Sequence, residues 1–477
     1  MRITRGFAPV LTLVAATALL AACTSSSAGS PQQGATSGQQ SAGSSTVSTV
    51  AGTESHPAVS GGPITVGSAG GSASASSPAG SSSGGASSSS VAASTSAPTT
   101  TKPTPKPTPT PTPKPPVATV SSSPAIGGKD LSPVQPITVK VAKGTIKDIS
   151  LVNPTGYHVK GTLSKDKASW TSGEDLGYGK TYKIAVTAVG TDGKTVPITG
   201  TYTMLVPAKQ ARTTISPGDG AVVGVAMPVM IQFLTTTPQD RALIEKNVSI
   251  TTTPKVDGAW AWIDHDGGIW GLDYRPKGYW PAGTKVHVEA HMYGLKFANG
   301  TYGKTDISSS FTIGRNQVVI ANAKAHNIVV KRAGKTVATY PASYGAATDT
   351  DTSAGHTATD RQTHSGIHVV NDLKEDITMT SPLFKYSEKE KWTVRISDNG
   401  EFIHANPDTI NQQGHTNVSH GCINLSLASA NAYYHTAMIG DPVQVTGTDV
   451  KLGPSDGDIF DYAIDWNTWV GLSGKNG

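Results

Sequence analysis

The residues of this chain best suited to chemistry lie in the stretch HTNVSHGCINLS, from His415 to Ser426. It contains Cys422, one of two cysteines among 477 residues, with His420 two positions before it. A cysteine attacks as its thiolate, and a free thiol is mostly protonated at neutral pH, so it needs an imidazole or oriented dipoles beside it. His404 and His420 are both candidates for that base. Gly421 has no Cβ, so the backbone N–H groups around it can turn toward a developing oxyanion.

Two other interpretations of Cys422 compete with a nucleophile. His404, His415, His420 and Cys422 could bind zinc, but structural zinc sites usually contain CxxC pairs and a single thiol is available here. Cys422 could also be a buried small apolar residue, as most free cysteines are. The two histidines, the glycines and the polar loop around it favour the nucleophile, and we predict no metal and no other cofactor.

A hairpin is expected to carry His404. Apolar and polar residues alternate from Trp392 to Ile396, and Asp398-Asn399-Gly400 is a hairpin turn signal. The following EFIHA is then the return strand, with His404 near its end. Residues 405–418 are polar and irregular, as a loop at a functional site would be.

A helix is expected directly after Cys422. The segment LSLASANAYYHTAMIG has Ser426 as a candidate N-cap, and Gly440, which precedes Asp-Pro, is a stop signal. The cysteine therefore lies on the segment that leads into a helix, while the histidine arrives from a neighbouring hairpin.

The other cysteine, Cys23, ends a segment with the features of an export signal. Arg2 and Arg5 precede an apolar run at residues 7–20, which is too short for a stable membrane anchor. The LAAC sequence resembles the lipobox of bacterial lipoproteins, in which the cysteine is diacylated and becomes the mature N-terminus. An ordinary secretory signal is the alternative. On the first interpretation the protein is lipid-anchored on the extracytoplasmic face of the cell membrane, and Cys422 is left as a lone thiol, which suggests a reactive group in an exported protein.

Residues 24–130 have the composition of a stalk that reaches from the membrane into the cell wall. They are mainly Ser, Gly, Thr and Ala, followed by TTTKPTPKPTPTPTPKPP, with almost no large apolar side chain to bury. Such a sequence does not offset its ordering entropy, and its Pro/Thr part favours an extended spacer. The formal net charge of +5 suits an anionic wall or lipid surface. Because no basic cluster is interleaved with aromatic residues, we predict no nucleic-acid partner.

The remaining chain predicts an all-β dominated fold in several domains. Short alternating runs separated by Gly, Asp and Asn turns indicate two immunoglobulin-like β-sandwiches, at residues 131–210 and 211–314. They lack the cysteine pair of antibody domains, so the likeness is architectural. The second block contains four tryptophans, which could form a sugar-stacking platform but are better explained by burial in the core and at a domain contact: Trp260, Trp262, Trp270 and Trp280. A third β-rich block follows at residues 315–448, and then a C-terminal extension at 449–477.

His404, fourteen intervening residues, and then Ser419-His420-Gly421-Cys422-Ile423-Asn424 resemble the signature of L,D-transpeptidases with the YkuD fold. The resemblance covers residues 316–448, and the preceding sandwiches, stalk and lipobox are similar to those of mycobacterial-type multi-domain members. It implies that the cysteine attacks the carbonyl of the third residue of a peptidoglycan tetrapeptide stem and releases D-Ala. The side-chain amine of a second stem then resolves the thioester and forms a 3-3 crosslink. It also implies β-lactams of the carbapenem type as inhibitors.

The same resemblance assigns roles to individual residues. Cys422 matches the nucleophile, and His404 matches the base, oriented by the backbone carbonyl of Ala405. The Gly421 and Cys422 amides match oxyanion donors. Four further side chains match positions that line the substrate site, and two of these stand in an active-site lid, ITMTSPLFKYSEKEKW: Ser419, Asn424, Met379 and Tyr386, with His420 beside them. The run Thr363-His364-Ser365-Gly366 stands where the family usually has Thr-Pro-Thr-Gly.

Other functions remain open from the sequence. The same acyl-enzyme could be resolved by water or by another amine, giving a carboxypeptidase or an enzyme that attaches proteins to peptidoglycan. A non-catalytic wall-binding scaffold would have no use for a histidine-flanked thiol. A papain-like protease is disfavoured because Cys422 lies near the C-terminus with its histidine upstream, and no Cys-Gly-Ser-Cys-Trp run is present.

The lipobox generates the first prediction. The wild-type protein is expected in the membrane fraction, and Cys23→Ala should release it or block its maturation, because the acylated residue is gone. Fractionation followed by N-terminal mass analysis measures both. Equal membrane association of the two proteins, with an unmodified N-terminus, would contradict the lipoprotein assignment.

Overall fold

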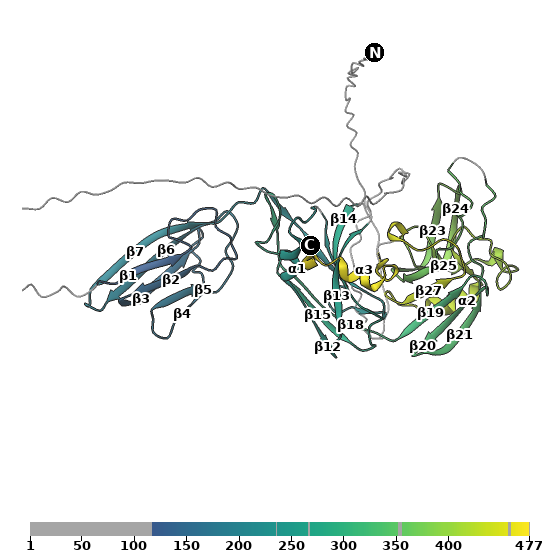
Figure 1. Ribbon diagram of the computed structural model, residues 1–477, viewed down its shortest axis with the longest axis horizontal. Helices are drawn as coiled ribbons and strands as arrows, with labels where there is room; N and C mark the ends of the chain where they lie inside the picture. The colour runs from purple at the N-terminus through teal and green to yellow at the C-terminus, as the bar shows by residue number, and fades with distance from the viewer. Residues whose placement is uncertain (1–116, 235, 266–267, 352–354, 457–458, 477) are drawn as a thin grey trace, which may run out of the picture. The chain divides into compact units, whose positions relative to one another are not determined.

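The computed structural model describes residues 117–476, apart from 235, 266–267, 352–354 and 457–458. The export signal, Cys23 and nearly all of the predicted stalk lie outside the described residues. Strands dominate the described chain, as the sequence predicts, and they form paired sheets (Figure 1). In this part of the chain no helix is both long and apolar enough to cross a membrane.

The first sandwich consists of a four-stranded and a three-stranded sheet that enclose a core around Trp170 and Tyr202. Their orders are β1-β2-β5-β4 and β3-β6-β7. The strands are β1 (Thr119–Ser123), β2 (Thr138–Ala142), β3 (Gly144–Val152), β4 (Gly161–Leu163), β5 (Ser169–Ser172), β6 (Thr181–Gly190) and β7 (Thr195–Thr203).

The sandwich begins earlier than the predicted boundary at residue 131. Strand β1 falls in the segment that the sequence assigns to the stalk, yet it pairs antiparallel with β2 along its whole length. Its sequence, TVSSS, has one large apolar residue, Val120, which packs against the core. Serine-rich composition hides the strand, and pairing to the sheet edge orders it.

The second sandwich has sheets of order β10-β18-β15-β12 and β13-β14-β11-β9, with a small sheet β16-β17-β8 at one side. The elements are β8 (Lys209–Ala211), β9 (Thr213–Ser216), β10 (Val222–Val223), β11 (Val229–Phe233), α1 (Arg241–Lys246), β12 (Val248–Thr253), β13 (Gly258–His265), β14 (Ile269–Pro276), β15 (Lys285–Ala290), β16 (Lys296–Ala298), β17 (Thr301–Gly303) and β18 (Ile307–Ile313).

The tryptophans of this sandwich serve its core, which confirms the prediction of burial. Trp262 and Trp280 are buried, and Trp260 and Trp270 pack against the same cluster. The Trp280 indole N–H donates to the Met227 carbonyl at 2.8 Å, so its polar edge is satisfied inside the core.

The third domain also consists of two sheets, β21-β20-β19-β27-β22 and β23-β24-β25-β26. Its elements are β19 (Gln317–Asn322), β20 (Asn327–Arg332), β21 (Lys335–Pro341), β22 (Gly366–Val369), β23 (Asp372–Ser381), β24 (Tyr386–Arg395), β25 (Phe402–Ala405), η2 (Pro407–Thr409), β26 (Ile423–Leu425), α2 (Leu427–Tyr434) and β27 (Pro442–Thr446). One core cluster takes side chains from both sheets and from α2.

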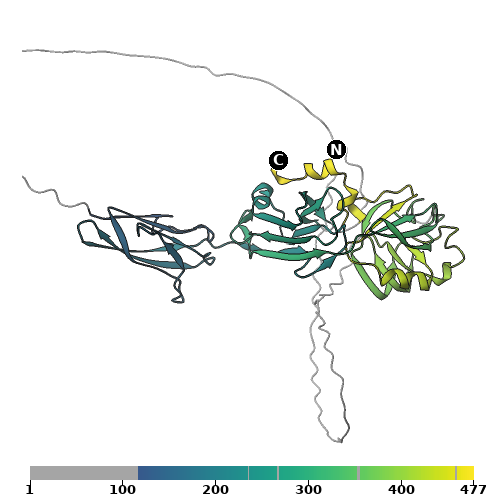
Figure 2. The ribbon, with the colours of Figure 1, turned by 90° about the horizontal axis from the view of Figure 1, so that it is seen from below.

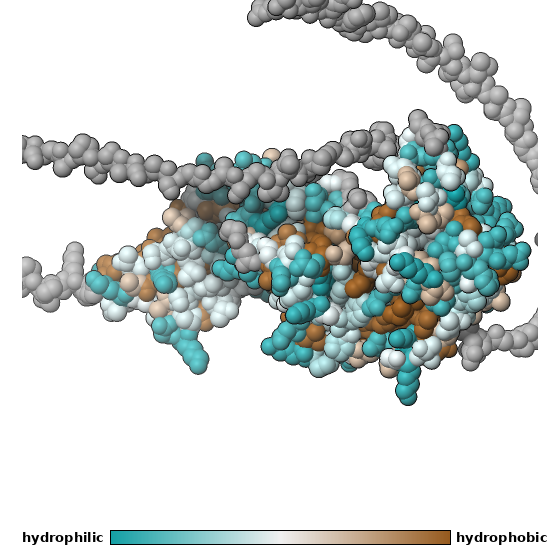
Figure 3. All heavy atoms as spheres, turned by 45° about the vertical axis from the view of Figure 1, so that its right-hand side comes forward, coloured by the Kyte–Doolittle hydropathy of each residue, from teal (hydrophilic) through white to brown (hydrophobic). Residues whose placement is uncertain are grey.

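Polar residues cover most of the face of the molecule seen in Figure 3, and apolar residues form smaller areas between them.

Parallel pairing of β25 with β26 brings the two ends of the signature together. Ile403 is opposite Ile423 and His404 is opposite Asn424, so the loop between the strands returns Cys422 to the side of the histidine. The predicted hairpin turn is present before β25, with Gly400 at a φ of +98°, a conformation that glycine adopts without steric cost.

Helix α2 follows Cys422 as predicted, but it ends earlier than the sequence suggests. The Ser426 hydroxyl accepts from the Ser429 N–H at 3.1 Å and caps the helix. The helix ends at Tyr434 and not at Gly440. Just beyond the helix, the Thr436 carbonyl accepts from the Gln317 amide at 3.0 Å. It also accepts from the Arg315 guanidinium, before the chain turns toward β27.

The C-terminal extension packs against the second sandwich. It contains η3 (Pro454–Asp456), η4 (Asp461–Ala463), α3 (Trp466–Gly471) and η5 (Gly474–Asn476). The buried Trp469 donates from its indole to the Ala259 carbonyl at 3.0 Å, and Figure 2 shows α3 in yellow beside the teal sandwich. The Arg275 guanidinium lies 4.5 Å from the Trp469 ring centroid and donates to the Ile464 carbonyl at 2.7 Å.

Backbone hydrogen bonds join the second sandwich to the third domain at Gly224. Its N–H donates to the Ile439 carbonyl at 2.7 Å, and the Ala226 N–H donates to the Gly440 carbonyl at 2.8 Å. A Cβ at Gly224 would lie 2.2 Å from the Gly440 carbonyl carbon. The contact therefore requires a residue without a side chain.

Gly224→Ala should lower the free energy of unfolding by about 1–3 kcal/mol, because the added methyl group meets backbone that cannot move aside easily. Thermal unfolding followed by circular dichroism measures the change. Gly218→Ala is the matched control, since a Cβ there would meet nothing within 4 Å. Identical melting curves for the two variants would refute the close approach.

Candidate active site

A cavity of about 220 Å³ in the third domain collects most of the residues that the sequence singles out. It lies between strand β24, strand β25 and the loop that carries Cys422. It is lined by Met379, Tyr386, Glu388, Glu390, His404, Asn406, Asp408, Thr409, Val418, Ser419, His420, Cys422 and Asn424.

The Cys422 thiol and the His404 ring form the centre of this cavity. Cys422 is 8% exposed and His404 is 3% exposed. Cys422 is close enough to His404 to be among the groups that raise the pKa of its ring. Its Nδ1 faces the Ala405 carbonyl at 2.9 Å and a Glu390 carboxylate oxygen at 3.1 Å, and both of these accept hydrogen bonds. Nδ1 therefore carries a proton, and Nε2 is the ring nitrogen left for the thiol. The orienting carbonyl predicted at Ala405 is in place.

The electrostatics of His404 favour an imidazolium. Burial is the largest influence and lowers the pKa of His404, but Cys422 and Glu390 together raise it by more than burial lowers it, and the net result is a pKa of about 10. A cation beside a thiol favours the thiolate, which is the reactive form of cysteine. A cysteine next to a base that is itself oriented by a third group has the arrangement of an activated nucleophile.

The loop before Cys422 is fixed by a short chain of hydrogen bonds. Gly421 has a φ of +123°, which a side chain would strain. The Ser419 hydroxyl accepts from the Gly421 N–H at 3.2 Å and donates to the Cys422 carbonyl at 2.5 Å. The Thr363 hydroxyl donates to the Gly421 carbonyl at 2.7 Å. In this geometry the Gly421 amide would have to exchange its partner to serve as an oxyanion donor.

The predicted lid is the hairpin of β23 and β24, and it covers the cavity from one side. Met379 and Phe402 form an apolar cluster with Cys422, against which Tyr386 packs. The His420 ring lies between two lid rings, with centroids 4.5 Å from Phe384 and 5.4 Å from Tyr386. Burial lowers the pKa of His420 and raises that of Tyr386 to about 12, so both rings are neutral near pH 7.

Other residues of the sequence analysis lie away from the reacting pair. His415 is exposed on the loop between η2 and β26, whereas His404 is buried in β25. Across the described residues, His, Cys, Asp and Glu side chains form no group of three or more placed to hold a metal ion. His364, which stands where the family usually has proline, donates its N–H to a Glu401 carboxylate oxygen at 2.7 Å, a bond that proline could not make.

Known proteins share this architecture. The family model for the L,D-transpeptidase catalytic domain matches residues 316–445, and a bacterial Ig domain model matches residues 128–296. L,D-transpeptidase 5 of Mycobacterium tuberculosis is 42% identical over 359 residues, which are 75% of this chain and 77% of that protein. The chain belongs to the L,D-transpeptidase family. L,D-transpeptidase 2 of the same species is 32% identical over 361 residues, covering 74% of this chain and 84% of that protein.

Solved structures of L,D-transpeptidases are among the proteins similar to this chain. A structure of an L,D-transpeptidase in complex with imipenem has 30% identity and a TM-score of 0.40, and it covers 50% of this chain and 100% of that one. The family assignment rests on the sequence relatives and confirms the YkuD-type domain that the signature around Cys422 indicates.

Several cavity residues of this L,D-transpeptidase escape sequence reasoning. Glu390 lies in the charged run SEKEK, which is typical of a solvated surface, and its burial follows only from pairing of β24 with β25. Phe384 at the lid turn does not line the cavity itself, but its ring contacts the lining residue His420 across 36 residues of sequence. Glu388, Asp408 and Thr409 likewise join the cavity through tertiary contacts. The alternation that places Glu388 and Glu390 on one face of β24 is the one signal that could have found them.

Glu390→Gln should lower the pKa of His404 from about 10 by about 1–3 pH units, because it removes a negative charge that stabilises the imidazolium. An NMR titration of the His404 ring signals measures this pKa. Glu388→Gln is the matched control, since Glu388 lines the same cavity but the hydrogen bond to the ring comes from Glu390. The assignment of this role fails if both variants titrate alike.

Proposed function

We propose that this L,D-transpeptidase crosslinks peptidoglycan through an acyl-enzyme on Cys422. The observation that carries the proposal is the buried pair of Cys422 and His404, with the histidine held as an imidazolium. The thiolate attacks the carbonyl carbon of the third residue of a tetrapeptide stem. The C–N bond to the terminal D-Ala breaks, the leaving nitrogen takes a proton from His404, and a thioester remains.

Acylation changes the state of His404 in a way that suits the second half of the reaction. The Cys422 thiolate is one of the two groups that raise the pKa of His404. Once the sulfur is in a thioester, that charge is gone and the pKa of His404 falls. The ring, which has given its proton to the leaving nitrogen, therefore stays neutral and can accept a proton. It takes a proton from the amine of the acceptor stem, the nitrogen attacks the thioester, and the C–S bond breaks. The products are a 3-3 crosslink and the regenerated thiolate.

The lid hairpin and the loop before Cys422 surround the reacting groups. Met379, Tyr386 and Phe402 shield the sulfur from water on the lid side, which limits hydrolysis of the thioester. The Ser419 hydroxyl holds the Gly421–Cys422 backbone, and the Cys422 amide is the proposed oxyanion donor. Asn424 and His420 line the cavity in which the stem peptides meet.

The location of the enzyme follows from the first residues of its sequence. Lipid on Cys23 anchors it to the outer face of the cell membrane, and the Pro/Thr-rich stalk gives the catalytic domain reach into the wall. The support for this part of the proposal is the lipobox-like LAAC sequence after a short apolar run.

A β-lactam of the carbapenem type should acylate Cys422 and give a single covalent mass increment, since a thiolate at this site opens a strained amide as it opens a stem peptide bond. Cys422→Ser should lose the adduct because a serine hydroxyl has a much higher pKa than a thiol. His404→Ala should slow acylation by about 10²–10⁴-fold, the usual contribution of a positioned base. Intact-protein mass spectrometry follows all three proteins.

His415→Ala is the matched control for that experiment, because His415 is an exposed histidine on the loop between η2 and β26. It should acylate at nearly the wild-type rate. In parallel, disaccharide-tetrapeptides are incubated with wild type and Cys422→Ala, and the products are weighed. Bound metal at one equivalent per chain, with no adduct on Cys422 and no crosslinked product, would overturn the proposal; water-resolved product alone would make the enzyme a carboxypeptidase.

A further inference from the structure

The charged side chains that line the active-site cavity are unbalanced in sign. Three of the thirteen lining residues are carboxylates, and none of the thirteen is Lys or Arg. Glu390 is buried and hydrogen-bonded to His404. Glu388, on β24, and Asp408, on η2, are exposed, so their charges face the solvent-filled part of the cavity.

A second feature of the cavity calls for a donor from a ligand. Asn424 is 2% exposed and lines the cavity, and its Nδ2 donates to the Thr409 hydroxyl at 3.3 Å. Its Oδ1 is buried and has no hydrogen-bond partner among the described residues. A buried acceptor without a partner costs free energy in the empty enzyme, and a ligand N–H would satisfy it.

The acceptor stem of the reaction brings a positive charge to this cavity. The acceptor brings a side-chain amine, which is an ammonium ion near pH 7 because the pKa of such an amine is about 10.4. A cleft lined by one sign of charge concentrates ligands of the opposite sign. Glu388 and Asp408 therefore attract the acceptor amine and would leave an uncharged nucleophile unaffected.

We propose that Glu388 and Asp408 determine the specificity of the acyl-enzyme for a cationic amine acceptor, with Asn424 Oδ1 accepting a hydrogen bond from an N–H of the bound stem peptide. The inference rests on the proposed function, since it concerns the second substrate of that same site. The ammonium binds beside the two carboxylates and releases one proton to solvent. The freed electron pair attacks the thioester, and the neutral His404 takes the second proton from the attacking nitrogen. The C–S bond then breaks, and the thiolate returns to its place beside the imidazolium.

The test is a competition for one acyl-enzyme, so that any effect on acylation cancels. The donor is a tetrapeptide whose side-chain amine is acetylated, and it cannot act as an acceptor. The two nucleophiles are a tripeptide with a free side-chain amine and hydroxylamine, which is uncharged at neutral pH. Mass spectrometry measures the ratio of amine product to hydroxylamine product, at low and at high salt.

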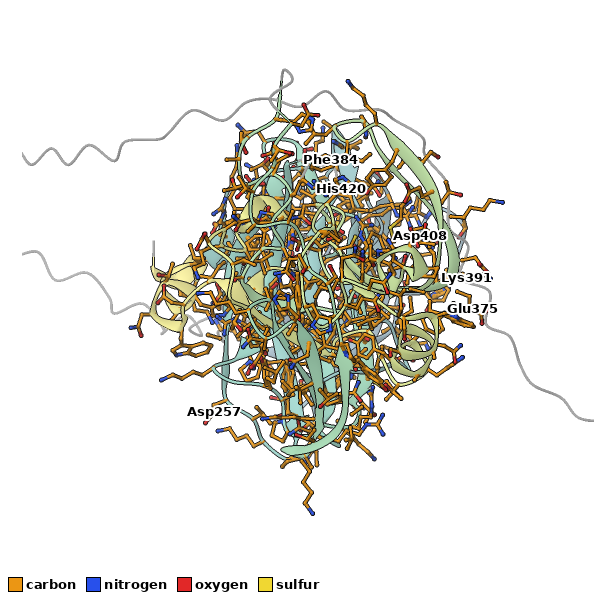
Figure 4. The ribbon with its side chains drawn as sticks, turned by 90° about the vertical axis from the view of Figure 1, so that its right-hand side faces the viewer. Asp257, Glu375, Phe384, Lys391, Asp408 and His420 are labelled. Carbon is orange, nitrogen blue, oxygen red and sulfur yellow. The ribbon has the colours of Figure 1, made fainter. Side chains whose placement is uncertain are left out.

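Removal of both charges in Glu388→Gln/Asp408→Asn should lower that ratio by roughly tenfold or more, the size of the effect expected for a charged cleft. High salt should lower the ratio for wild type and leave the double variant nearly unchanged, because screening acts on the charges that the variant lacks. Glu375→Gln is the matched control: Glu375 is an exposed carboxylate on β23 of the same hairpin, on the same side of Figure 4 as Asp408, but it does not line the cavity.

An unchanged ratio in the double variant, or an equal fall in the Glu375→Gln control, would overturn the proposal. Failure of this inference can be distinguished from failure of the proposed function. D-Ala release that requires Cys422 reports formation of the acyl-enzyme, whichever nucleophile then resolves the thioester. Asn424→Asp adds a charge in place of the amide and should raise the ratio; a fall would show that Asn424 Oδ1 does not face the acceptor.

Discussion

The active site depends on one constraint. The buried ring of His404 needs hydrogen-bond partners and negative charges around it if it is to be protonated. A charged imidazole inside a protein is costly unless hydrogen bonds and opposite charges compensate for the lost water. Here the compensation comes from the Ala405 carbonyl, the Glu390 carboxylate and the Cys422 thiolate. The same partners that make the charge tolerable also fix the ring and leave Nε2 directed to the sulfur. Stability of the charge and orientation of the base are therefore one property of the site.

The surrounding strands can be understood as the means of satisfying that constraint. Parallel pairing of β25 with β26 sets His404 beside the segment of Cys422, and antiparallel pairing of β24 with β25 delivers Glu390. The positive φ of Gly421 and the hydroxyls of Ser419 and Thr363 hold the nucleophile's backbone. Lid residues then close the apolar side of the sulfur, so a reactive thiolate is kept from water while the opposite side of the cavity stays open to peptides.

The C-terminal segment connects this site to the second sandwich. The Asp456 carbonyl accepts the N–H groups of Asp398 and Asn399, and the carbonyl oxygen of the next residue of that turn, Gly400, lies 3.5 Å from the Cys422 sulfur. Further along, Trp469 is buried against the sandwich. The turn beside the nucleophile is thus held by a segment whose own packing depends on another domain, which gives the sandwich a part in positioning the site.

The sequence by itself determined the features that depend on neighbouring residues and on a long, specific signature. The strand alternation, the turn at Asp398–Gly400, the Ser426 cap and the assignment of Cys422 and His404 all follow from local patterns, because turn and cap preferences act over a few residues. Tertiary structure decided the rest. Strand β1 is too poor in apolar residues to be predicted without the sheet edge that orders it. Helix α2 ends at Tyr434, and the Thr436 carbonyl just beyond it binds Arg315 and Gln317, over a hundred residues away. The local sequence around Glu390 predicts an exposed charge. Its burial and its hydrogen bond to His404 arise from the pairing of β24 with β25, a contact between segments that local sequence patterns do not predict.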